Sequence, residues 1–325
     1  MGALPWAEWD HGAASVRAAA VRADEGVAEA YAWSAQNRKW PSRRQYRRRD
    51  ASCILRLGTA CALASWRLTT QIWPCSLNAS RLEAGRKIGI TIHVASILGS
   101  FGRTSPTYFP SPPDLEYGND ALLALAHDHP DAVRGYVTVN PNYTAHACAE
   151  IARCLGAGMV GIKLAASRRA TEALLDPICE VAAKRGVPVL HHVWQHRRHD
   201  WPGQEASDGA ELCALAARHP KVRFILAHIG GGGDWQHSLA AIRGGPGGVP
   251  NVYIDLSGSG VDGGMLEACL DAAGPERLLF GTDLTIDTGW AKLRYLERLL
   301  PPRELELVMW RNAASIFPRG AFPAD

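Results

Sequence analysis

The chain lacks several features that would assign it to a class at once. Its formal net charge is only +3 over 325 residues, so no excess of positive charge argues for nucleic-acid binding. Its eight cysteines include no Cys-x-x-Cys pair, which excludes a small disulfide framework. No Gly-x-Gly-x-x-Gly motif follows the first regular strand pattern, so the dinucleotide fingerprint is missing as well.

The composition that is present is typical of a globular protein. With 47% hydrophobic and 21% charged residues, the chain is too apolar to be disordered, and its length suits one large α/β domain or two smaller ones. Five of the cysteines fall in helix-like runs, where they are typical of free thiols in a reducing compartment. We therefore expect a cytoplasmic protein. These cysteines are Cys148, Cys154, Cys179, Cys213 and Cys269.

The first quarter of the chain differs from the rest. Residues 1–87 hold 14 Lys and Arg against 7 Asp and Glu, whereas residues 88–325 hold 21 against 25. Six of the 11 tryptophans precede residue 74. Because this segment shows neither helix nor strand periodicity, we expect residues 1–87 to be an atypical, poorly structured extension and residues 88–325 to form the folded domain.

Three other interpretations of this extension remain open. The basic run at residues 42–49 precedes an apolar stretch, as in an export signal, but Arg56 interrupts that stretch. The same run could be a nucleic-acid patch, although isolated arginine runs are more often solvated. A wrong start or reading frame in the gene would also produce such a segment. We expect neither a nucleic-acid nor a membrane partner.

Strand-like and helix-like segments alternate after residue 88. The strands from the second onward begin 26 to 34 residues apart, which is the length of a βα unit. Runs such as Val-Arg-Phe-Ile-Leu-Ala are apolar on both faces, which favours a parallel sheet covered by helices. The pattern predicts a (β/α)₈ barrel or a doubly wound sheet. The predicted strands are Ile90–Ser96, Gly135–Asn140, Gly161–Leu164, Val187–Val193, Val222–His228, Val252–Leu256 and Leu278–Gly281.

Polar side chains stand where several of these strands end. Because the carboxyl ends of parallel strands meet at one rim, we expect these side chains to converge there. Imidazole together with carboxylate suits zinc or a similar divalent ion. Other histidines (His127, His129 and His219) end predicted helices, where the helix dipole favours them. The residues at the strand ends are Lys163, His191, His192, His228, Asp255, Ser257, Ser259 and Asp283, with Trp194 just after the fourth of the predicted strands.

Residues 88–317 resemble the amidohydrolase superfamily, in the amidohydrolase-related branch that includes carboxymuconate-semialdehyde-type decarboxylases. The resemblance lies in the order and spacing of seven stretches, residues 134–141, 158–164, 188–192, 224–231, 252–258, 279–283 and 312–317. It implies a (β/α)₈ barrel that holds one or two metal ions. It also implies that His192 is the fifth-strand metal ligand, and that His228 on the sixth strand is a ligand or the acid/base. Asp283 on the eighth strand would bind metal and move the water proton.

The chain departs from the family pattern at the first strand. That strand should carry a His-x-His pair, but no predicted strand does, and the strand around His93 has a single histidine. We expect the first strand to be missing or atypical, in the segment before residue 80. Lys163 matches the place where dinuclear members have a carboxylated lysine, although an ion-paired structural lysine fits this branch better. We expect Lys163 and Trp194 to line the substrate pocket.

The sequence therefore predicts a metal-dependent hydrolase. A metal ion, most simply Zn²⁺, would activate water to attack an amide, ester or lactone of a small-molecule substrate. Two alternatives stay open: a non-oxidative decarboxylase of an aromatic or unsaturated acid, and a catalytically inactive barrel that lacks the His-x-His ligands. A homo-oligomer is compatible with each of them.

Overall fold

The computed structural model describes residues 66–72, 78–101, 103–193, 203–229, 235–244, 248–258, 263–283 and 289–323. All of these lie in one compact unit, Cys61–Asp325. Residues 1–65, for which the sequence analysis predicts little structure, lie outside the described residues. Among the helices described, none has the length and apolar character needed to cross a membrane.

Within the described residues, eight parallel strands form a single sheet in which each strand pairs with the next along the chain. This order is that of a (β/α)₈ barrel, and it confirms the predicted α/β class. The strand Gly161–Leu164 has the predicted bounds, and the other predicted strands differ only at their ends. The strands are β1 (Trp66–Ile72), β2 (Ile90–Ile97), β3 (Val133–Val139), β4 (Gly161–Leu164), β5 (Val189–His192), β6 (Phe224–Ala227), β7 (Val252–Asp255) and β8 (Leu278–Leu279).

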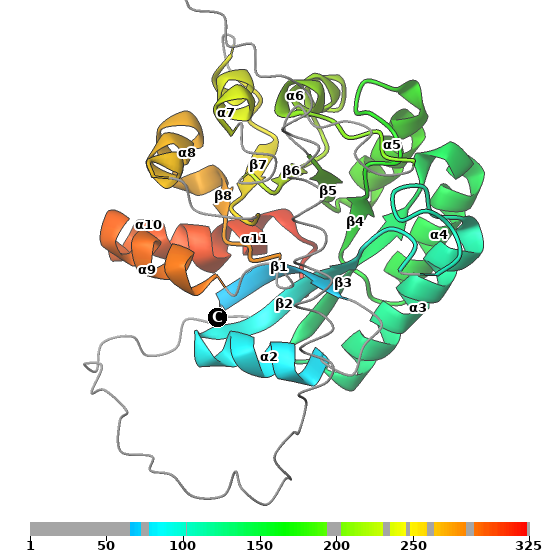
Figure 1. Cartoon of the computed structure of the whole chain (residues 1–325), viewed down its shortest axis with the longest axis horizontal. Helices are drawn as coiled ribbons and strands as arrows, with labels where there is room; N and C mark the ends of the chain where they lie inside the picture. Colours follow the sequence, from blue (N-terminus) through cyan, green and yellow to red (C-terminus); the bar gives the residue numbers. More distant parts are fainter. Residues whose placement is uncertain are drawn as a thin grey trace, which may run out of the picture. The chain divides into compact units, whose positions relative to one another are not determined.

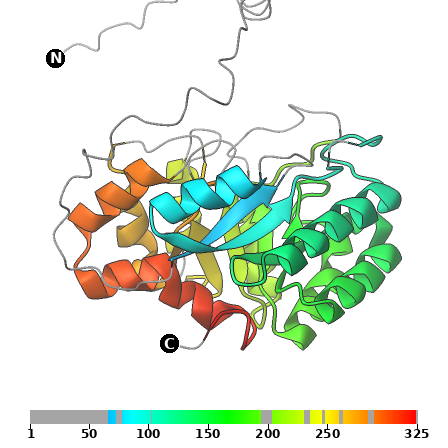
Figure 2. The same ribbon diagram turned by 90° about the horizontal axis from the view of Figure 1, so that it is seen from below.

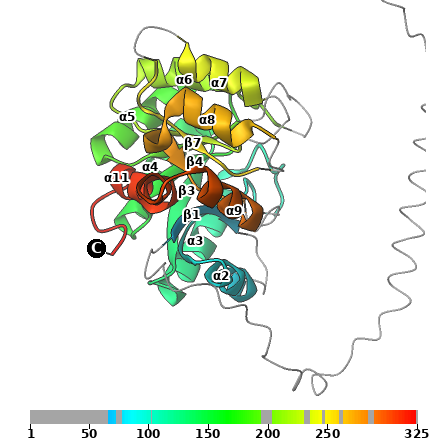
Figure 3. The same ribbon diagram turned by 90° about the vertical axis from the view of Figure 1, so that its left-hand side faces the viewer.

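The helices surround these strands (Figure 1). Seen from below, α2 runs beside β1 and β2, and α3 lies next to α4 (Figure 2). From the left-hand side, α6, α7 and α8 follow one another along the sheet (Figure 3). The helices are α2 (Asn78–Lys87), α3 (Pro112–Asp128), α4 (Thr144–Gly156), α5 (Asp176–Arg185), α6 (Gly209–Arg218), α7 (Trp235–Arg243), α8 (Met265–Ala273), α9 (Trp290–Leu299), α10 (Pro302–Glu306) and α11 (Asn312–Ile316).

The first strand exists and lies before residue 88. β1 pairs with β2 from Trp66 to Ile72, with an irregularity after Trp66. The helix α2 also precedes residue 88. The sheet thus begins within the segment that the sequence analysis assigned to an extension. The sequence of β1, Trp-Arg-Leu-Thr-Thr-Gln-Ile, contains no histidine, so finding the strand does not supply the missing pair.

Successive side chains along each strand point alternately to the two faces of the sheet. They form an outer core between the sheet and the helices and an inner core on the opposite face. Ile162 and Leu164 of β4 belong to the large cluster between sheet and helices. A second cluster contains Leu190 of β5 and Ile225 of β6, on the opposite face of the sheet. Phe317, just after α11, joins this inner cluster. Since successive side chains point to opposite faces, the inner face also receives Lys163 and His192.

Candidate functional site

Two of the residues predicted for the site have unusual backbone conformations. His228 follows β6 with φ 62°, and Asp283 follows β8 with φ 48°. They are among four non-glycine residues of positive φ in the described part of the chain, and the others, Phe101 and Ala166, also follow strands. Residues other than glycine adopt a backbone conformation of positive φ at a cost of about 1–3 kcal/mol. The fold therefore holds His228 and Asp283 in place against a local preference.

A hydrogen-bonded relay fixes the orientation of His228. The Ser257 hydroxyl donates to Asp255 Oδ2 over 2.6 Å, and the Ser257 N–H donates to Asp255 Oδ1 over 3.0 Å. His228 Nδ1 lies 3.0 Å from Ser257 Oγ. Because an ionised carboxylate only accepts, the serine proton points to Asp255 and His228 Nδ1 must carry the proton of its own hydrogen bond. The lone pair of this imidazole is then on Nε2.

The relay leaves His228 Nε2 with a lone pair that can accept a proton. This nitrogen is buried and makes no hydrogen bond within the described residues, and the same is true of Asp283 Oδ1. The other carboxylate oxygen, Asp283 Oδ2, lies 3.6 Å from His228 Nδ1. The ring of His192 stands edge-on to that of His228, with centroids 4.9 Å apart. The structure thus brings together three of the predicted site residues.

Two buried lysines balance two buried carboxylates beside these rings. Lys163 and Lys292 are 1% and 0% exposed, and Asp255 and Asp283 are 1% and 6% exposed. Burial raises the pKa of both carboxyls, an effect that Lys163 and Lys292 oppose at Asp283. Burial lowers the pKa of Lys163 to about 8, although both carboxylates favour its charged form. The formal charges of the four groups cancel, as is required of ions withdrawn from water.

The imidazoles of the site are neutral at pH 7. Burial lowers the pKa of His228 to about 3, with a smaller contribution from Lys163. Burial also lowers the pKa of His192 well below its ordinary value, and His228 and Lys163 add to the effect. Neutral imidazole can accept a proton or bind a cation, whereas imidazolium cannot. Strongly shifted pKa values in one polar cluster are typical of functional sites.

Other sequence candidates lie elsewhere or are not described. Trp194 is outside the described residues. His93 on β2 packs against Gly85 of α2, where a Cβ atom would come within 2.7 Å of the ring, so it faces away from the barrel interior. His129 and His219 cap the carboxyl ends of α3 and α6, as predicted.

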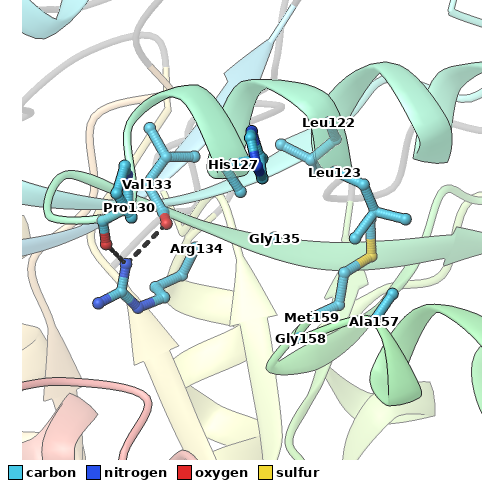
Figure 4. A pocket seen from close by; sticks show the side chains of 11 residues that line it. Leu122, Leu123, His127, Pro130, Val133, Arg134, Gly135, Ala157, Gly158 and Met159 are labelled. Carbon is cyan, nitrogen blue, oxygen red and sulfur yellow. Dashed lines mark hydrogen bonds between the residues drawn. The ribbon is translucent and has the colours of Figure 1, made fainter.

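A cavity of about 270 Å³ opens at the other end of the sheet (Figure 4). Its walls include His127 of α3, Val133 and Arg134 at the start of β3, and Met159 before β4. Arg134 donates to the carbonyl oxygens of Pro130 and Val133. Because it lies at the amino ends of the strands, this cavity is remote from the polar rim. The His-x-His sequence at residues 127–129 lies at this end too, so it cannot replace the pair expected on the first strand.

Asp255 and Ser257 were expected at this rim but without an assigned role, and Lys292 was not expected there. Residues i and i+2 of a strand end share one face and can bond to the same neighbour, so a joint role for Asp255 and Ser257 was detectable in principle. Nothing in the sequence indicated that Lys292 belongs to the site, because a lysine in a surface helix such as α9 is expected to be exposed to solvent. In the structure its ammonium is buried and donates to the carbonyl oxygen of Gly258 over 3.3 Å.

Comparison with known proteins shows the family to which the chain belongs. A model of the amidohydrolase family matches residues 115–319, which is more than half of the chain. The chain belongs to the amidohydrolase family. No curated protein matches it.

Solved structures of other family members share the fold. One from Staphylococcus aureus, assigned as an amidohydrolase, is 16% identical with a TM-score of 0.62, over 78% of this chain and 99% of that one. A dihydroxybenzoic acid decarboxylase from Polaromonas, with bound manganese and 2-nitroresorcinol, is 16% identical with a TM-score of 0.58, over 78% and 97%. A structure from Pseudomonas putida assigned as a 2-pyrone-4,6-dicarboxylic acid hydrolase is 17% identical with a TM-score of 0.53, over 78% and 97%. At such identities the likeness shows the fold alone.

The described residues at this rim do not fit a complete catalytic metal site. His192, His228 and Asp283 offer suitable donor types, but no three His, Cys, Asp or Glu side chains within the described ranges are grouped so that they could hold an ion. The sequence of β1 adds no imidazole or carboxylate. Because a catalytic zinc normally takes three protein ligands, the chemistry proposed for this rim rests on the chain's own side chains.

Proposed function

We propose that this amidohydrolase-family chain is a hydrolase that adds water to an amide, ester or lactone of a small molecule at the rim around His228. The observation that carries the proposal is the relay from Asp255 through Ser257 to His228. It leaves His228 Nε2 without a proton at the carboxyl end of the barrel strands. In this fold, catalytic groups come from the ends of several strands at that face. His228, Asp283 and Lys163 come from three of them.

Each of these groups has a defined part in hydrolysis. His228 Nε2 takes the proton of the attacking water and later gives it to the leaving nitrogen or oxygen. The Lys163 ammonium, charged below its pKa of about 8, stabilises the negative charge that develops on the carbonyl oxygen. The Asp283 carboxylate, 3.6 Å from His228 Nδ1, stabilises the imidazolium formed in between. The water oxygen thus joins the carbonyl carbon, and the bond to the leaving group breaks.

A non-oxidative decarboxylase is the second candidate, and the two buried lysines favour it. Lys163 and Lys292 supply the positive charge that a substrate carboxylate needs in a buried site. Loss of CO₂ also requires a proton donor to the carbon left behind. Burial lowers the pKa of His228 to about 3 and its Nε2 bears a lone pair, so at neutral pH this nitrogen holds no proton to donate. For this reason we propose hydrolysis as the first candidate.

A two-substrate assay separates these functions. The purified full chain is given 2-pyrone-4,6-dicarboxylate, with ring opening followed by absorbance, and 2,6-dihydroxybenzoate, with CO₂ release followed. We expect ring opening, its loss in His228→Ala, and unchanged turnover in the control His127→Gln, whose side chain is 90% exposed. Release of CO₂ without ring opening would establish decarboxylation instead, and no turnover of either compound favours the inactive barrel.

The same assay tests the metal independence of this rim. We expect ring opening to survive treatment with a chelator, since the described donors do not form a three-ligand group. Turnover that disappears with the chelator and returns with Zn²⁺ or Mn²⁺ would contradict this expectation.

Removing the Ser257 hydroxyl should impair turnover without removing the base. In Ser257→Ala, His228 Nδ1 loses its 3.0 Å contact, so the ring is free to rotate or change tautomer. We expect kcat to fall about 10- to 100-fold, as for other groups that orient a functional imidazole. Ser257→Thr keeps a hydroxyl and should recover most of the loss. Ser315→Ala, which removes a hydroxyl bonded to the backbone of α11, is the control, and equal rates in all three variants would contradict the relay.

A further inference from the structure

We propose that Tyr108 forms the specificity-determining wall of the substrate site at this rim, and that it selects substrates with a flat, conjugated ring over saturated ones. The inference rests on the proposed function, because it names the substrate class of that same site. Two independent sets of contacts carry it: those that place the Tyr108 ring beside the imidazoles, and those that fasten its loop, residues 103–111.

The Tyr108 ring extends the row of rings that begins at the base. Its centroid lies 5.7 Å from that of His192, with the planes 44° apart, and His192 lies 4.9 Å from His228. Burial raises the pKa of the Tyr108 phenol and Asp283 raises it further, so the phenol is within electrostatic reach of the carboxylate. Tyr108 is only half-buried, so the described residues leave part of its surface uncovered.

Asp114 fastens the start of this loop. Its carboxylate accepts from the backbone N–H groups of Thr104 and Ser105, over 3.1 and 2.8 Å, and from the Ser105 hydroxyl over 2.5 Å. The Ser105 hydroxyl oxygen also accepts from the N–H of Ser111, over 2.9 Å. Hydrogen bonds to a charged group are the stronger kind. Asp114, in the first turn of α3, therefore holds the start of the loop, and Ser105 joins that start to the end of the loop at Ser111.

The middle of the loop is fastened on both sides of Tyr108. The carbonyl oxygen of Thr107 accepts from the N–H of Ser100 and lies where a Cβ of Gly99 would be, at 1.6 Å, so only glycine fits there. On the other side, Phe109 packs against Gly203, where a Cβ would come within 2.5 Å. Because the loop is ordered before a ligand arrives, little conformational entropy is lost on binding.

A wall of this kind discriminates by shape and by electrostatics. Aromatic rings attract one another in offset or edge-to-face arrangements, with an energy equivalent to about tenfold in affinity. A saturated ring of the same size is thicker and lacks the charge distribution of a π system. We therefore expect the substrate site to prefer a planar ligand, and to lose the preference when the Tyr108 ring is removed.

Matched ligands test this inference without turnover. Benzoate and cyclohexanecarboxylate have the same charge and nearly the same size, and calorimetry gives the affinity of the full chain for each. We expect wild type to bind benzoate about tenfold more tightly. Tyr108→Ala should bring the ratio close to one, whereas Tyr108→Phe should retain it. Tyr108→Leu serves as a second ring-free variant if the alanine variant unfolds.

The control is Tyr117→Ala on α3. Tyr117 is 47% exposed and its ring lies 6.0 Å from that of Phe101, near the same loop but without a contact to His192. It should leave the affinity ratio unchanged. A ratio that survives in Tyr108→Ala, or a wild type with no preference, overturns the inference. Retained preference for benzoate in a chain that turns over neither assay substrate would instead remove the proposed hydrolysis and leave the Tyr108 wall in place.

Discussion

Asp283→Asn is expected to lower kcat for ring opening by about 10²- to 10⁴-fold, the range associated with loss of acid–base catalysis. The substitution keeps the shape of the side chain and removes its charge. His228 Nδ1 then loses a carboxylate at 3.6 Å, and the imidazolium formed in the reaction is no longer stabilised by it. Lys163 also loses one of its two anionic neighbours. Steady-state kinetics on the full chain gives the result.

The matched control for this change is Asp271→Asn. Asp271 lies on α8, is paired with Arg243 over 2.5 Å, and has a side chain that is 77% exposed. An exposed pair contributes at most about 1 kcal/mol, so stability should change little and kcat should stay within about twofold. If Asp283→Asn and Asp271→Asn have the same kcat, Asp283 takes no part in the reaction.

Lys163→Met is expected to remove a pH dependence from the stability of the fold. The ordinary pKa of lysine is 10.5, and burial lowers that of Lys163 to about 8 in the folded chain. Between these values the unfolded chain binds more protons, so the free energy of unfolding gains a contribution that rises with pH. Below pH 8 the buried charge imposes its full cost. The difference in unfolding free energy, wild type minus variant, should increase by about 1.5 kcal/mol from pH 8 to 9.5.

This difference must be measured against the variant, because other groups titrate in the same range. Burial raises the pKa of the thiols of Cys179, Cys213 and Cys269, so their contribution to stability falls as the pH rises. They are present in both proteins and cancel in the subtraction. Urea unfolding at the two pH values gives the four free energies. Lys184→Met, which removes an exposed lysine of α5, should show no such increase. A Lys163→Met difference that is flat or falls with pH contradicts the depressed pKa.

The regular part of the barrel was predictable because the two sequence patterns that indicate it, short apolar runs and their regular spacing, are read directly along the chain. Buried parallel strands such as Gly161–Leu164 are short apolar runs, and they recur at the spacing of a βα unit. β1 was not predictable, since Trp-Arg-Leu-Thr-Thr-Gln-Ile mixes polar and apolar residues without a clear face. Its strand conformation comes from pairing with β2 over seven residues, which is a tertiary contact.

The site was predictable in part for the same reason. His192, His228 and Asp283 stand at strand ends, and strand ends of a parallel sheet share one rim, so their convergence follows from topology. The left-handed backbone of His228 and Asp283 does not follow from it. The metal expectation came from the imidazole and carboxylate donors at the strand ends and from the family pattern, but the described residues do not group three donors.

The sequence by itself determined the parallel α/β architecture, the family, and the rim at which the polar residues meet. Each follows from periodicity and order along the chain. Only the tertiary structure decided which nitrogen of His228 is free, because that depends on a hydrogen bond to Ser257, 29 residues away. It also decided that Lys163 and Lys292 are buried with two carboxylates. Protonation and charge in a buried site depend on neighbours in space, and strands distant in sequence supply those neighbours.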